Sequence, residues 1–304
     1  MTPLDATELS FNETTLTVLN IIIGLIMFGV ALDIRVDDFK RVIREPKGPI
    51  IGLVAQFLLL PAATFLLVLA IDPAPSIALG MMLVAACPGG NFSNFLSHFA
   101  KANAALSVSM TAISTLLAIV MTPLNLAFWG SRTAGTKAIL TEVDLSPVDM
   151  LVTIVVILGI PLGLGMLLAA RRPALAARLR TPMRVFSLVA FGAFIVGALA
   201  GNWQAFLDHV GAVALVVAIH NAVGLSLGYW SARGLGSHRY DARAVSIEVG
   251  IQNSALGLVL VFGFFDGLGG MAIIAAWWGV WHLISGLTVA TWWRRRPVPV
   301  PELA

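Results

Sequence analysis

Residues 246–254 read SIEVGIQNS, and this stretch lies inside a predicted membrane span. Ala244 and Val245 precede it, and the apolar run ALGLVLVF (255–262) follows it. The stretch therefore places a carboxylate, that of Glu248, at the depth of the hydrocarbon core, beside two carboxamides and a glycine. An acidic residue at the centre of a membrane helix costs roughly 2.5–3.5 kcal/mol, and such residues mostly mark functional sites. We interpret this stretch as one half of a binding site.

The composition is typical of an integral membrane protein. Of the 304 residues, 58% are hydrophobic and 12% are charged, with a mean hydropathy of +0.91, whereas soluble domains are about 25% charged. The chain is too apolar for a nucleic-acid-binding protein in spite of its pI near 9.4. Its single cysteine, Cys87, excludes an internal disulfide and a thiolate metal cluster. No histidine or cysteine cluster has metal-ligand spacing, so we expect neither zinc nor copper.

A membrane-spanning helix needs about 20 apolar residues. Runs of this kind predict an all-α polytopic protein with about nine spans, at residues 15–32, 49–70, 76–100, 104–129, 147–169, 184–201, 209–231, 241–265 and 271–293. All lysines and arginines except Arg132 and Lys137 fall in the loops on one side or at the span ends beside those loops. The positive-inside rule places those loops in the cytoplasm, which predicts an outside N-terminus and a cytoplasmic C-terminus.

Two predicted spans are interrupted. Residues 76–100 contain Pro88-Gly89-Gly90, which cannot continue a regular helix, and residues 241–265 contain the opening stretch. Interrupted helices occur in lipid where the freed backbone groups line a cavity or bind a ligand. Each is the third in a run of four spans, the first to fourth and the sixth to ninth. This order indicates an inverted repeat, with the fifth span unpaired.

Several polar side chains in the predicted spans have oxygen atoms that could bind a cation. Ser107 and Thr111 are four apart and share one helix face, and Gln56 lies in the middle of the second span. A lone serine or threonine usually bonds to its own helix, and the Pro-Gly-Gly segment could be a packing kink. Glu248 is different, because no lysine or arginine lies inside any other predicted span. One carboxylate with hydroxyls, amides and unwound carbonyls favours a monovalent cation, and hence cation-coupled transport of an anion.

Two long motifs resemble those of the bile acid:sodium symporter family. The first is CPGGNFSN (87–94), continued by Ser107 to Thr111, and the second is EVGIQN (248–253). The segments VAQF (54–57), which contains Gln56, and WHLISG (281–286) are similar to flanking segments of the family. The resemblance runs from about residue 19 to residue 293.

The resemblance implies a panel domain and a core domain, the core built on two crossing broken helices. Within a single transmembrane unit, residues 1–304, the panel would comprise 15–32 and 147–201, and the core 49–129 and 209–293. Bacterial members typically have ten spans, so this chain would lack the first, as animal members do. We expect the inner (plasma) membrane of a bacterium.

Family sodium sites carry over residue by residue, which implies two Na⁺ ions and no cofactor. The first site would comprise Ser93, Asn94, Ser107, Thr111 and Glu248. The second would comprise Gln56, Glu248 and Gln252, with the carbonyls of Val249 and Ile251. The substrate would lie between core and panel, beside Asn91, Phe92, Asn253 and His282.

We therefore expect a non-enzymatic, sodium-coupled symporter that imports an organic anion, bile acid-like or a small carboxylate, by alternating access. A cation/proton antiporter that uses Glu248 as proton carrier is the alternative, although such proteins often use a pair of acids and only one lies at depth here. An intramembrane enzyme would need a nucleophile with a base, and no such motif is present, so we assign no catalytic residue. The identity of the anion, the oligomeric state and the roles of His220 and His282 stay open, and a monomer suffices for the mechanism.

Overall fold

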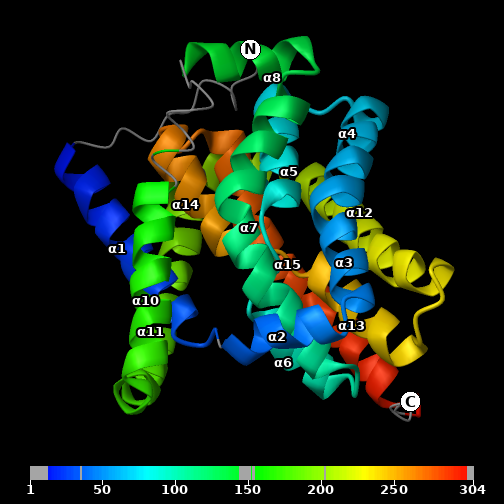
Figure 1. Ribbon diagram of the computed structural model, residues 1–304. Helices are drawn as coiled ribbons and strands as arrows, with labels where there is room; N and C mark the ends of the chain where they lie inside the picture. Colours follow the sequence, from blue (N-terminus) through cyan, green and yellow to red (C-terminus); the bar gives the residue numbers. More distant parts are fainter. Residues whose placement is uncertain (1–12, 35, 144–151, 153–154, 202, 300–304) are drawn as a thin grey trace.

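The computed structural model describes residues 13–34, 36–143, 152, 155–201 and 203–299. The regular structure of these residues is helical (Figure 1). The elements, with η for a π-helical turn, are α1 (Glu13–Ala31), α2 (Val36–Arg44), α3 (Lys47–Val54), η1 (Ala55–Leu59), α4 (Leu60–Ile71), α5 (Pro75–Ala86), α6 (Phe92–Phe99), α7 (Ala104–Gly130), α8 (Ala134–Glu142), η2 (Val155–Gly159), α10 (Ile160–Arg171), α11 (Pro173–Gly201), α12 (Trp203–Gly234), α13 (Arg239–Gly250), α14 (Ser254–Phe264) and α15 (Gly269–Arg294).

The prediction of an all-α polytopic membrane protein is confirmed. Within the described residues, four helices are long and apolar enough to cross a membrane, and they are Lys47–Ile71, Ala104–Gly130, Val213–Gly234 and Gly269–Arg294. The helix of the sixth predicted span begins at Pro173 rather than near residue 184. The first part of the fifth predicted span, 147–154 apart from Val152, lies outside the described residues.

Two short helices, α2 and α8, occupy stretches that the sequence predicts as loops. Asp37 and Asp38 lie in the first turn of α2, where acidic side chains favour the helix dipole. The hydroxyl of Thr133 caps α8 by accepting from the backbone N–H of Thr136. Both helices have 9 residues, so a search for long apolar runs does not detect them.

Each π-helical turn ends two residues before a proline. Proline has no N–H to donate to the preceding turn, and η1 and η2 are followed by Pro61 and Pro161. The Leu60 N–H bonds to the Ala55 carbonyl, five residues back. This widened turn contains Gln56, and π-turns are frequent at functional sites.

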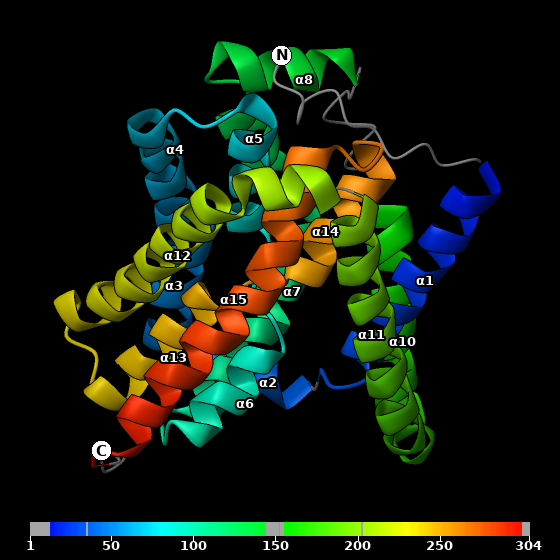
Figure 2. The ribbon, with the colours of Figure 1, turned by 180° about the vertical axis from the view of Figure 1, so that it is seen from behind.

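Both predicted breaks are present, and they pair with each other. One separates α5 from α6 and the other separates α13 from α14. Gly89 and Gln252 form an isolated antiparallel bridge. Gly90 N–H donates to the Ile251 carbonyl at 2.7 Å, and Asn253 N–H donates to the Pro88 carbonyl at 2.8 Å. The two broken helices therefore run in opposite directions and meet through their unwound backbones (Figures 1 and 2).

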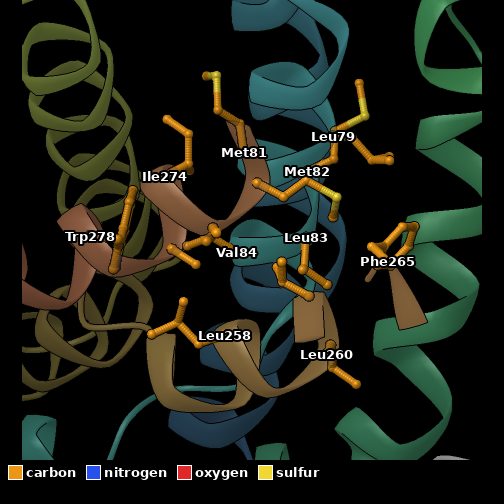
Figure 3. Packing of buried hydrophobic residues seen from close by; sticks show 14 of the residues in the cluster. Leu79, Met81, Met82, Leu83, Val84, Leu258, Leu260, Phe265, Ile274 and Trp278 are labelled. Carbon is orange, nitrogen blue, oxygen red and sulfur yellow. The ribbon is translucent and has the colours of Figure 1, made fainter. Parts of the chain in front are cut away.

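Apolar clusters lie on both sides of the paired breaks. One cluster joins α5, α14 and the first half of α15, and Figure 3 shows Leu83 of α5 near Leu260 of α14. A second cluster joins α6, α13 and the last turns of α15, and includes Leu96 and Ile247. The polar breaks therefore occupy the level between two apolar layers, because each broken helix contributes one half to each cluster.

The helices α1, α10 and α11 pack against one another and form a group to one side of the paired breaks (Figures 1 and 2). Gly29 of α1 allows this packing, since a Cβ there would lie 3.0 Å from the Met183 Cβ of α11. Arg180 of α11 donates to the Leu32 carbonyl at 3.0 Å and lies 3.5 Å from the Asp33 carboxylate. This group joins the remaining helices through contacts of α1 and α11 with α14, of α11 with α15, and of η2 with α7.

Candidate functional site

The carboxylate of Glu248 lies at the centre of a buried oxygen cluster. Its Oε2 accepts from Ser93 Oγ at 2.5 Å and from Ser107 Oγ at 3.0 Å. Its Oε1 accepts from Thr111 Oγ1 at 2.7 Å. Glu248 belongs to α13, Ser93 to α6 and the other two hydroxyls to α7. Two consecutive helices and a third that is distant in sequence therefore supply one site. Glu248 itself is only 2% exposed.

This cluster holds more acceptor oxygens than protons. Thr111 Oγ1 lies 3.1 Å from Asn94 Oδ1 and 3.0 Å from the Ser107 carbonyl, as well as near Glu248. Its single proton can serve only one of these three acceptors. Ser93 Oγ also lies 3.4 Å from Ser107 Oγ and 3.4 Å from Thr111 Oγ1. All five residues predicted for the first ion site are thus brought together, and a cation would satisfy the surplus lone pairs.

A pair of carboxamides connects the two breaks. Gln56 Nε2 donates to the Cys87 carbonyl at 2.6 Å and to Gln252 Oε1 at 2.8 Å. Gln252 Nε2 in turn donates to Gln56 Oε1 at 3.1 Å and to the Val249 carbonyl at 2.6 Å. Both side chains are 1% exposed. Three members of the predicted second ion site, Gln56, Gln252 and Val249, are therefore in direct contact.

The other two members of the predicted second ion site, Ile251 and Glu248, make their contacts elsewhere. The Ile251 carbonyl accepts from Gly90 N–H at 2.7 Å, so it is part of the bridge between the breaks. In the described part of the chain, the side-chain hydrogen bonds of Glu248 go to Ser93, Ser107 and Thr111, and none goes to Gln56 or Gln252. Gly89 lies directly against Glu248, since a Cβ there would collide with the carboxylate and lie 3.1 Å from Cγ.

The residues predicted to contact substrate lie at the starts of the second half-helices and on α15. Asn91 is exposed and precedes α6, and its side chain makes no capping hydrogen bond. Phe92 stacks on Phe95, with ring centroids 5.4 Å apart. Asn253 caps α14, because its Oδ1 accepts from Leu256 N–H at 3.0 Å. His282 is 5% exposed and lies one turn before Gly286, where a Cβ would meet Leu96 and Ile251.

Two capping residues at the breaks were not predicted as site residues. Asn221 of α12 donates from Nδ2 to the Gly250 carbonyl at 2.7 Å. Thr122 of α7 donates to the Ala86 carbonyl at 2.7 Å. Asn221 could have been predicted as a site residue from its sequence position, because its carboxamide lies in the middle of the apolar seventh span. Ser114 and Thr115, by contrast, both donate to the Thr111 carbonyl of their own helix, as isolated hydroxyls in membrane helices usually do.

The helix dipoles fit charged ligands of both signs. The C-terminal ends of α5 and α13 point at the breaks, and a helix C-terminus favours a cation. The N-terminal ends of α6 and α14 begin there, and a helix N-terminus favours an anion. The ligand atoms are carboxylate, hydroxyl, amide and carbonyl oxygens, which suit a hard cation rather than zinc or copper.

Comparisons with known proteins show the family of the chain. Residues 20–209 match the family model described as "Sodium Bile acid symporter family". The chain is 34% identical over 278 residues to the "Uncharacterized sodium-dependent transporter YocS" of Bacillus subtilis (strain 168), which covers 91% of this chain and 83% of that protein. It is 34% identical over 276 residues to the "Probable sodium/metabolite cotransporter BASS1, chloroplastic" of Oryza sativa subsp. japonica, covering 90% of this chain and 65% of that protein. It is 30% identical over 247 residues to the "Ileal sodium/bile acid cotransporter" of Homo sapiens, covering 81% of this chain and 69% of that protein. With its paired broken helices and buried carboxylate, this integral membrane protein belongs to the sodium bile acid symporter family, whose members include sodium-dependent transporters.

Proposed function

We propose that the protein is a sodium-coupled symporter that imports an organic anion, with two Na⁺ ions in each cycle. The observation that carries this proposal is the buried carboxylate of Glu248, which is surrounded by hydroxyls from two other elements. A buried carboxylate without a basic partner is costly, and a bound monovalent cation would neutralise it. Relatives named as sodium-dependent transporters and as sodium/bile acid cotransporters support the same reading.

The first sodium ion would bind among Ser93, Asn94, Ser107, Thr111 and Glu248. The second would bind near Gln56, Gln252 and Glu248, with the carbonyls of Val249 and Ile251. The amide pair supports the second assignment, because Gln56 and Gln252 already bridge the two breaks. Binding there would require these amides to turn their oxygens toward the ion, since their nitrogens now donate to the Cys87 and Val249 carbonyls.

The substrate would be an organic carboxylate or sulfonate, bile acid-like or smaller. Asn253 supports an anion at this position, because its Oδ1 caps α14 and leaves the Nδ2 donor for another partner. Asn91 is exposed at the start of α6, and Phe92 is half-buried beside it. His282 would provide a further donor from α15. Two helix N-termini and these side chains together offer N–H groups to a carboxylate.

Transport would proceed by alternating access. We take the group α1, η2, α10 and α11 as the panel, and the helices α3 to α7 and α12 to α15 as the core. Sodium binding would tie the two broken helices together and order the N-termini that receive the anion, and core and panel would then rock against each other. The contacts of the panel with α7, α14 and α15 would be the ones that change.

The orientation and the energetics follow from the charges. We propose an outside N-terminus, a cytoplasmic C-terminus and a location in the bacterial inner membrane. Two Na⁺ ions with one monovalent anion carry one net positive charge inward in each cycle. This charge contributes about 2.3 kcal/mol per 100 mV of membrane potential.

A ligand screen by thermal unfolding tests the function and identifies the anion class. The full-length protein, purified in detergent, is heated with a panel of carboxylates and sulfonates, in sodium chloride and in potassium chloride at equal ionic strength. We expect some anions to raise Tm in sodium and not in potassium, because bound ions would order the anion site. Stabilisation of equal size in both salts would contradict sodium coupling.

Uptake into proteoliposomes separates symport from the antiport alternative. With the anion from the screen, uptake should require an inward sodium gradient at fixed pH, and Glu248→Ala should abolish it. An antiporter that uses Glu248 as proton carrier would instead exchange sodium for protons, and its flux would follow a pH gradient without any anion.

A further inference from the structure

The carbonyl groups at the ends of α5 and α13 are each held by a carboxamide from another helix. The last carbonyls of a helix have no partner within the helix. At the end of α5, the Cys87 carbonyl accepts from Gln56 Nε2 at 2.6 Å. At the end of α13, the Gly250 carbonyl accepts from Asn221 Nδ2 at 2.7 Å. Gln56 lies in the helix that precedes the first broken helix, and Asn221 lies in α12, which precedes the second.

The face of α12 that carries Asn221 is built for close contact with α13. Gly224 lies three residues after Asn221, and Gly228 lies four residues after Gly224, which keeps all three on one helix face. A Cβ at Gly224 would lie 3.2 Å from the Val249 carbonyl oxygen, and a Cβ at Gly228 would lie 2.6 Å from that of Val245. Ser246 of α13 also donates to the Leu225 carbonyl at 2.6 Å. The backbone of α13 is therefore held against α12 up to the break.

The residue before Asn221 fixes α12 on its other side. His220 Nε2 lies 2.7 Å from Thr64 Oγ1 of α4, and its ring packs on Trp278 of α15 at 4.7 Å between centroids. Thr64 donates its own proton to the Leu60 carbonyl at 2.8 Å, so His220 Nε2 is the donor to Thr64. His220 and Asn221 are 0% and 1% exposed. The position of Asn221 is thus set by packing on α4, α13 and α15.

We propose that Asn221 is a positioning residue for sodium binding at the second break, the second-repeat counterpart of Gln56. This inference rests on the proposed function. The Gly250 carbonyl lies between those of Val249 and Ile251, the two backbone groups proposed to bind sodium. Because Asn221 holds the middle carbonyl, it fixes the peptide planes on either side and so the directions of the flanking carbonyls. Without this hydrogen bond, the three carbonyls would reorient and sodium would bind less tightly.

The test is a sodium titration of the thermal stability of the full-length protein in detergent. Sodium chloride replaces potassium chloride at constant ionic strength, and the concentration that gives half of the Tm increase is measured. Asn221→Leu removes the donor at similar volume, and we expect that concentration to rise about fivefold or more. Asn221→Ser, whose hydroxyl is too short to reach Gly250, should shift it in the same direction and decides the test if the leucine variant does not fold.

Asn125→Leu is the matched control. Asn125 also donates its carboxamide to a backbone carbonyl, that of Met121 at 2.9 Å, but within its own helix α7. This variant should lower Tm in potassium and leave the half-saturating sodium concentration unchanged. Wild-type sodium affinity in a folded Asn221 variant would overturn the inference alone. Absence of any sodium effect on the wild-type protein would instead overturn the proposed function, and the inference with it.

Discussion

Gly89 lies so close to Glu248 that any side chain there would displace the carboxylate. We expect Gly89→Ala to raise the half-saturating sodium concentration more than tenfold and to lower stability by about 1–3 kcal/mol, as overpacking does. Gly163→Ala is the control, because among the described residues no atom outside the neighbouring backbone of α10 lies within 4 Å of a Cβ at Gly163. Sodium titrations of Tm compare the two, and normal affinity in Gly89→Ala would contradict this account of the site.

Ser107 and Ser109 are neighbouring buried serines of α7 with different partners. Ser107 donates to Glu248, whereas Ser109 donates to the Ala105 carbonyl of its own helix at 3.0 Å. Ser107→Ala should raise the half-saturating sodium concentration about three- to tenfold, the effect of one hydrogen-bonding group. Ser109→Ala should bind sodium as the wild-type protein does. Equal effects of the two substitutions, measured by the same titration, would argue against a sodium ion beside Glu248.

At the scale of elements, the π-helical turn η1 decides where the Gln56 side chain points. Pro61 has no backbone N–H to donate to the preceding turn, and that turn is widened. In the widened turn, the Gln56 side chain points toward the Cys87 carbonyl and Gln252. Replacement of Pro61 by alanine restores the N–H and permits a regular α-helix, which would rotate Gln56 away from both partners. We therefore expect Pro61→Ala to weaken sodium binding although it removes a helix-breaking residue.

Pro161→Ala provides the comparison for that variant. Pro161 also follows a π-helical turn, η2, but it packs near Gly24 of α1, away from the breaks. Its replacement should leave the sodium titration unchanged. If both proline variants shift the titration equally, the turn at Gln56 has no special role in ion binding.

At the scale of the whole molecule, the proposed rocking motion requires the panel to move relative to the core. Gly159 of η2 lies near Ile119 of α7, with 3.6 Å between a Cβ at Gly159 and Ile119 Cδ1. A reducible thiol cross-link between cysteines introduced at these positions should stop uptake, and reduction should restore it. The sodium-dependent rise in Tm should persist in the cross-linked protein, because the paired breaks are not affected.

A cross-link within the panel is the control for that experiment. Gly29 and Met183 join α1 to α11, with 3.0 Å between a Cβ at Gly29 and the Met183 Cβ. Cysteines at these positions should cross-link without loss of uptake, since both move with the same group. The native Cys87 is fully buried, so it does not compete for the reagent. Undiminished uptake across a complete 159–119 cross-link would rule out the rocking motion.

The sequence by itself determined that the chain is an all-α membrane protein and where two of its helices break. Long apolar runs have no stable alternative to helix in lipid, and Pro88-Gly89-Gly90 cannot continue one. The cost of a buried carboxylate also predicted a functional role for Glu248, and the chemistry of Ser107 and Thr111 favoured a cation there. These conclusions depend on local composition, which is why they needed no knowledge of contacts.

Only the tertiary structure decided which polar groups meet. The pairing of Gly90 with Ile251 and the reach of Asn221 to Gly250 join residues far apart in the chain, and hydropathy does not encode such distances. A carboxamide bonds its own helix at Asn125 and another helix at Asn221. A threonine hydroxyl likewise bonds its own helix at Thr115 and another helix at Thr122. The difference lies in which helix packs against that face, and packing is fixed only when all the helices have assembled.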